Sequence, residues 1–128
     1  MKIKYIRNNQ VWVKQQNRIN KLLEKSYDDL SIQEKLELAY DKYFKKEKIS
    51  YSEYEMMLMT NDEIEFIYKN EEYQVIHESP TCTTMCIISY GNKEPIIRCI
   101  NYSSTIELLE LFRIEGKSII EIWDEVTF

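Results

Sequence analysis

Apolar residues recur at helical spacing through roughly the first sixty residues of the chain. In residues 11–25 they form one stripe of a helix whose other faces carry Lys, Arg and Gln. A second helix is expected to begin at Ser31, because Ser31 and Glu34 have the spacing of a capping box. A third, shorter helix is expected to begin near Ser50 or Ser52. The N-terminal part is therefore predicted to be helical.

The hydrophobic period changes from 3.6 to 2 at residues 63–68, which predicts a strand with one buried face. A two-residue turn at Asn70-Glu71 would return the chain into a second strand. Residues 84–90 and 96–102 predict another hairpin. The pairs expected from these turns are Tyr68 with Tyr73, Phe66 with Val75, Ile64 with His77, Ile88 with Ile97, and Cys86 with Cys99.

The last part of the chain returns to helical spacing. Ser103 or Ser104 is expected to cap one helix, Gly116 to end it in a left-handed conformation, and Ser118 to begin a last short helix. The order is therefore N-terminal helices, a four-stranded antiparallel meander and C-terminal helices, an α+β fold. We expect one domain over residues 1–128.

The net charge of -5 conceals a strong asymmetry along the chain. Residues 1–50 carry 12 basic and 7 acidic side chains, a balance of +5, and residues 51–128 carry 5 basic and 15 acidic, a balance of -10. We interpret the first segment as a basic helical module and the second as an acidic core of meander and helices. Charged residues interrupt every apolar run that could form a signal peptide or a membrane helix, so we expect a cytoplasmic protein with no membrane partner.

The residues that could carry chemistry are sparse. The two glycines are 25 positions apart, which excludes the glycine-rich phosphate-binding loops. The soft ligands His77, Cys82, Cys86 and Cys99 lack the paired spacing of zinc sites, and neither Cys82 nor Cys86 shows a local activating group beyond His77. Packing is the simpler interpretation of these side chains, and the acidic pairs fall on polar faces. We therefore expect no metal, no cofactor and no enzymatic activity.

Two motifs carry a family resemblance over residues 51–126. They are the strand EIEFIY at residues 63–68 and the tail IEGKSIIEIW at residues 114–123. With them, this segment resembles a family of small, mostly uncharacterised proteins from low-GC Gram-positive bacteria and their mobile elements. The resemblance implies a short helix, a four-stranded meander and a helical tail, and it transfers no catalytic residue. Residues 1–50 lie outside it and have the character of an added helical module.

These features favour a non-catalytic inhibitor of the phage or mobile-element type, comparable to immunity or anti-defence proteins such as anti-CRISPR proteins. It would bind a basic protein, a nuclease or toxin, through an acidic surface. The carboxylates expected to form that surface are Glu63, Glu65 and Glu78 on the outer face of the sheet and Glu71 and Glu72 at a turn.

The alternative hypothesis is a nucleic-acid-binding regulator that uses the basic N-terminal helices. Its contact residues would be Lys14, Arg18, Lys21 and Lys25, preceded by Lys2, Lys4 and Arg7. The opposite charges of the two segments also permit self-association, in which the basic arm of one copy docks on the acidic sheet of another. A small enzyme would need a deep pocket lined by His77 or by a buried Glu.

Overall fold

A computed structural model describes the backbone of residues 9–128 and their side chains from residue 11 onward. The chain divides into two compact units, Met1–Ile49 and Ser50–Phe128. Each unit is described by itself below. The basic residues Lys2, Lys4 and Arg7 lie outside the described residues.

The first unit contains two helices, α1 (Asn9–Leu23) and α2 (Ile32–Phe44), with the 3₁₀ turn η1 (Tyr27–Asp29) between them. The predicted capping box is confirmed: the Ser31 hydroxyl accepts a bond from the Glu34 N–H, and the Glu34 carboxylate accepts one from the Ser31 N–H. A small apolar cluster joins the two helices and the turn between them. Its members are Ile19, Leu22, Leu30 and Leu38.

The apolar side chains of α2 are not all buried. Ile32 and Phe44, at the two ends of the helix, are exposed, whereas Leu36, Leu38, Ala39 and Tyr40 are buried. A helix places about 3.6 residues in each turn, so the face that meets a neighbouring helix is fixed by packing and not by apolarity alone. Terminal apolar residues can then extend beyond the contact.

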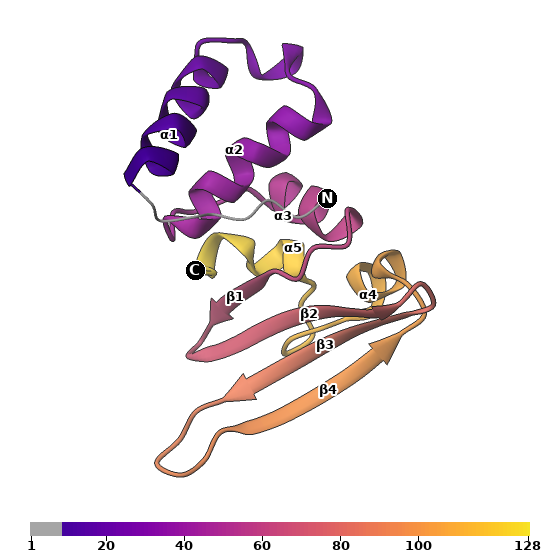
Figure 1. Cartoon of the computed structure of the whole chain (residues 1–128). Coiled ribbons are helices and arrows are strands. Elements are labelled where there is room, and N and C mark those ends of the chain that lie inside the picture. Colours follow the sequence, from indigo (N-terminus) through magenta and orange to yellow (C-terminus); the bar gives the residue numbers. More distant parts are fainter. Residues whose placement is uncertain (1–8) are drawn as a thin grey trace. The chain divides into compact units, whose positions relative to one another are not determined.

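The second unit is built on a four-stranded antiparallel sheet in the order β1-β2-β3-β4 (Figure 1). The α+β class and the meander are as predicted. The strands run over β1 (Glu65–Tyr68), β2 (Glu71–Ser79), β3 (Cys82–Ser89) and β4 (Ile96–Tyr102). Three helical segments precede or follow the sheet: α3 (Tyr51–Met59), α4 (Thr105–Leu111) and α5 (Ile119–Ile122), the last continued by the 3₁₀ turn η2 (Trp123–Glu125).

The two hairpin registers give different outcomes. The second hairpin is confirmed, since Ile88 faces Ile97 and Cys86 faces Cys99. The first is wrong by two residues: Phe66 pairs with Tyr73, and the turn lies one residue earlier than predicted. A shift of two residues leaves every side chain on its expected face.

The turn itself explains the shift in register. Lys69 and Asn70 both have positive φ, at 48° and 65°. Two-residue hairpins favour turns with positive φ at both central positions, because that twist matches the twist of the strands. The sequence marks Asn70 as tolerant of this conformation but gives no such signal for Lys69.

Aromatic side chains from α3, β1 and η2 pack against one another on one face of the sheet. The Tyr54 ring of α3 lies 5.7 Å from that of Phe66 in β1 and 4.6 Å from that of Trp123, measured between centroids. The Tyr73 and Phe112 rings are 6.2 Å apart and extend this core beneath α4. These contacts define the inner face of the sheet. The opposite side of the same strands is the outer face.

Gly116 does not end the helix that precedes it. The helix α4 ends at Leu111, and Phe112 follows in an extended conformation. Glu115 and Gly116, with φ of 51° and 80°, instead form a tight turn. Two backbone bonds of 2.8 and 2.9 Å between Ile114 and Lys117 close it. The left-handed glycine was correctly anticipated, but a two-residue turn, and not a helix cap, requires it.

Candidate functional site

The outer face of the sheet in the second unit has a regular chemical arrangement. Paired residues of antiparallel strands lie on the same face, so the register places the side chains in rows across the sheet. One row contains Ile67, Glu72, Ile88 and Ile97, and the next contains Glu65, Gln74, Cys86 and Cys99.

Carboxylates are concentrated on the β1–β2 side of this outer face. Glu65 is exposed and accepts a 2.7 Å hydrogen bond from the Gln74 side chain on the neighbouring strand. Glu72 lies beside the Tyr90 phenol, whose pKa is raised first by desolvation and then by Glu72. Glu78 is exposed near the end of β2. None of the outward positions of the four strands is Lys or Arg, so the charged side chains at these positions are all acidic.

Two of the expected acidic residues need separate treatment. Glu63 is exposed two residues before β1 begins, in step with the outward alternation of Glu65. Glu71 is not at a turn with Glu72, because both lie inside β2 and successive strand residues point to opposite faces. Glu71 points to the inner face, where it accepts a bond from the Ser89 hydroxyl and lies 3.4 Å from the Arg98 guanidinium. The five carboxylates therefore do not form one platform.

Apolar side chains border the carboxylates on the same face. Ile97 in β4 is 62% exposed, and Ile88 beside it in β3 is half-buried. Tyr90, just beyond β3, is also exposed. Sequence reasoning did not assign Tyr90 or Ile97 to a surface. The confirmed pairing of Ile88 with Ile97, together with strict alternation from Cys99, is the signal that could have found Ile97.

A separate cleft of about 210 Å³ opens where the inner face meets the turn after α4. Its polar lining mixes opposite charges: Lys69 binds Glu115 at 2.9 Å, and Arg98 lies near Glu71. Tyr73 also lines it, and burial, followed by the nearby Glu71 charge, raises the pKa of this phenol to about 12. His77 does not line the cleft, so the pocket with His77 that an enzyme hypothesis required is not this one.

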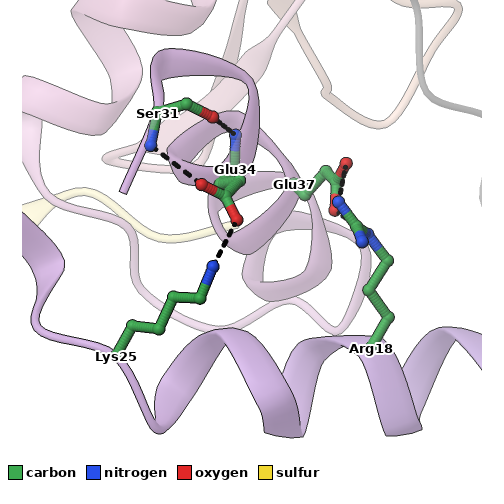
Figure 2. Close-up of polar contacts among 5 residues, drawn as sticks. All are labelled: Arg18, Lys25, Ser31, Glu34 and Glu37. Atoms are coloured by element: carbon green, nitrogen blue, oxygen red, sulfur yellow. Dashed lines mark hydrogen bonds and ion pairs between the residues drawn. The ribbon is translucent and has the colours of Figure 1, made fainter. Parts of the chain in front are cut away.

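The basic face of α1 is partly neutralised within the first unit. Arg18 forms a bidentate pair with Glu37 of α2, with nitrogen–oxygen distances of 2.5 and 3.0 Å (Figure 2). Lys25 binds the Glu34 carboxylate at 3.2 Å, and Glu34 is held in turn by its capping box (Figure 2). These contacts lower the pKa of Glu34, with the Ser31 backbone N–H as the largest cause.

The other two basic candidates, Lys14 and Lys21, are exposed on α1. A helix repeats its direction about every 3.6 residues, so Lys14, Arg18 and Lys21 lie along one side of α1, and Lys25 follows two residues after its end. Two of the four already bind carboxylates of α2. The charge available to a phosphate backbone is correspondingly smaller than the sequence alone suggests.

The soft ligands do not meet at one point. His77 pairs with Thr83, which places it on the inner face, and its Nε2 lies 3.1 Å from the Asp62 carbonyl oxygen. Cys86 and Cys99 lie on the outer face. Cys82 lies two residues before the outward Thr84, 3.7 Å from its hydroxyl. Among residues 9–128 no group of three or more His, Cys, Asp or Glu side chains is arranged to hold a metal ion.

The helices in the described part of the chain include none that is long and apolar enough to cross a membrane. Comparison with known proteins gave no significant match to a family model, to a curated protein or to a solved structure. The resemblance over residues 51–126 therefore stays an expectation from sequence.

Proposed function

We propose that this chain is a protein-binding inhibitor that uses the outer face of its sheet to cover a basic protein, with a nuclease or toxin as the expected class of target. The observation that carries the proposal is the charge of that face. Glu65 and Glu72 point outward, Glu78 lies beside Cys82 at the end of the sheet, and no outward strand position is basic. Such a surface attracts a cationic partner and repels nucleic acid.

The neighbouring apolar side chains give the same face a means of holding a partner. Protein interfaces combine an apolar centre with a polar rim, and electrostatics contributes more to the association rate than to the final affinity. Ile97 and Tyr90 are exposed beside the carboxylates, and their burial would supply the affinity that surface charges alone do not. Because β4 holds Ile97 in a fixed row, binding at this position costs little ordering of the backbone.

Steric blocking is the mechanism that fits this arrangement. An acidic face can occupy the phosphate-binding surface of a basic nuclease and so exclude its nucleic-acid substrate. The nucleic-acid hypothesis is less well supported, because Arg18 and Lys25 are paired with Glu37 and Glu34.

The test compares the wild-type chain with the double variant Glu65→Gln and Glu72→Gln as baits in a pull-down from lysate of the source organism. Any basic protein retained by wild type is purified, and its inhibition is titrated with both chains. We expect the double variant to bind at least roughly ten-fold more weakly, which corresponds to a loss of about 1.4 kcal/mol in binding free energy.

The matched control is Glu110→Gln together with Asp124→Asn, which removes two exposed carboxylates elsewhere in the second unit. We expect this control to bind like wild type. Equal weakening by both double variants would show that only net charge matters and would contradict the assignment of the face. Retention of nucleic acid instead of a basic protein would favour the alternative function.

A further inference from the structure

We propose that Cys86 and Cys99 are a dithiol modification site, which low-molecular-weight disulfides such as glutathione disulfide convert to an intramolecular cross-strand disulfide. The proposal does not depend on the identity of a protein partner. It concerns the outer face of the sheet, where the two cysteines are direct neighbours on β3 and β4.

Backbone geometry already satisfies the requirement for a bond. Directly opposed residues of an antiparallel pair have Cα atoms about 4.5–5.5 Å apart, and disulfides span Cα distances of about 4.4–6.8 Å. The two sulfur atoms lie 2.6 Å apart. Closing them to a bond of about 2.05 Å therefore needs only a small side-chain movement, and the strands need not separate.

The two thiols differ in exposure, which assigns their roles. Cys99 is exposed on the edge strand, and Cys86 is buried beside it. Burial, followed by the neighbouring Cys99, raises the pKa of the Cys86 thiol to about 12. An external disulfide can therefore reach Cys99, while Cys86 stays protonated and protected until a neighbouring sulfur becomes electrophilic.

The reaction balances in two exchange steps. The Cys99 thiolate, its proton given to solvent, attacks glutathione disulfide; a bond forms between Cys99 and one glutathione sulfur, and the other glutathione leaves as a thiolate with the electron pair. Cys86 then gives its proton to solvent and attacks the Cys99 sulfur. The protein disulfide forms, the mixed disulfide breaks, and the second glutathione leaves. The dithiol is oxidised, and one glutathione disulfide is reduced to two thiols.

The third cysteine provides an internal control. Cys82 lies on the same strand as Cys86, and its sulfur is 3.6 Å from the Glu78 carboxylate and 3.7 Å from the Thr84 hydroxyl. It has no opposing cysteine in the register, because its partner in β2 is Ser79. The pair should therefore react together while Cys82 keeps its thiol.

The experiment equilibrates the full chain with mixtures of reduced and oxidised glutathione, quenches it in acid and counts free thiols with a maleimide of large mass. We expect wild type to fall from three thiols to one as the oxidised fraction rises, with loss of two hydrogens from the intact mass. The Cys82→Ser variant should fall from two thiols to none.

Removing either member of the pair should abolish the internal bond. The Cys86→Ser and Cys86→Ala variants should retain a single glutathione on Cys99, and Cys99→Ser should keep both remaining thiols. Because Cys99 is exposed, its replacement is expected to leave the fold intact, which circular dichroism verifies. Three free thiols at every glutathione ratio would overturn the proposal, as would a disulfide containing Cys82 or one joining two chains.

Discussion

Glu71 and Glu72 are adjacent in β2 and point to opposite faces of the sheet. Glu71 meets Ser89 and Arg98 on the inner face, whereas Glu72 lies beside Tyr90 on the outer face. The carboxylates of two consecutive glutamates thus lie on opposite surfaces of the unit. They provide a paired test of which face binds a partner.

We predict that Glu72→Gln weakens partner binding and that Glu71→Gln leaves it within about two-fold of wild type, since only Glu72 lies on the proposed surface. The measurement is a titration of each variant against the captured partner. A larger loss of binding affinity with Glu71→Gln would indicate that the partner binds at the cleft on the inner face.

The pair of Arg18 and Glu37 should contribute little to stability despite its bidentate geometry. The Arg18 side chain is 57% exposed, and exposed ion pairs are worth about 0.2–1 kcal/mol. We expect Glu37→Gln to lower the free energy of unfolding by no more than this in urea at low salt. Most of the difference should vanish at about 1 M salt, where screening extends over about 3 Å. Glu24→Gln, at an exposed position of the same unit, is the control, and a large salt-independent loss would contradict the interpretation.

The serine caps should matter more than the ion pairs. Ser50 begins α3, and its hydroxyl accepts a 3.1 Å bond from the Glu53 N–H while the Glu53 carboxylate accepts one of 2.9 Å from the Ser50 N–H. We expect Ser50→Ala to lower the free energy of unfolding by about 1 kcal/mol. Ser50→Asp should keep most of that stability, because Asp also caps helices. Chemical denaturation measures both. Equal stability of Ser50→Ala and wild type would mean that the cap is dispensable.

Acid should destabilise the chain through its capping carboxylates. The pKa of Glu34 is lowered mainly by the Ser31 backbone N–H, and that of Glu121 mainly by the Ser118 backbone N–H. A lowered pKa in the folded state gives stability that is present above the unfolded value of about 4.3 and is lost as pH falls through the folded value. Urea unfolding between about pH 6 and pH 3 should show this decline. The decline should be shallower in Glu34→Gln, and an unchanged slope in that variant would contradict the assignment.

Alkali should act through Tyr73, whose pKa is raised to about 12 by burial and then by Glu71. The unfolded phenol ionises near pH 10, so its contribution to stability is complete below about pH 10 and is lost as pH rises through about 12. In Tyr73→Phe the free energy of unfolding should fall less steeply as pH rises. Tyrosinate absorbance should show one fewer late-titrating group in the variant, and the same late titration in both chains would contradict the assignment.

The features that the sequence predicts correctly are local. Ser31 and Glu34 are three residues apart, and both hydrogen bonds of their capping box run between these two residues. The pairing of Cys86 with Cys99 follows from alternation on both sides of one short loop. The turn at Lys69 was missed because a lysine rarely marks a left-handed conformation, and the twist of the paired strands decides it.

The features that the sequence could not give depend on contacts between distant residues. Arg18 and Glu37 are far apart in the sequence, so their pairing appears only once the two helices are packed. The separation of Glu71 from Glu72 required the correct turn, since a carboxylate placed in a loop has no defined face. The sequence alone therefore could not show that Glu71 and Glu72 lie on opposite faces of the sheet.

Carboxyl footprinting of the chain, free and bound to its captured partner, tests the acidic face most directly. A carbodiimide with a small amine labels exposed carboxylates, and mass spectrometry assigns the sites. Binding through the outer face predicts protection of Glu65 and Glu72, with Glu110 and Asp124 labelled equally in both states. Protection confined to Glu110 and Asp124, or unchanged labelling of Glu65 and Glu72 in a saturated complex, would contradict it.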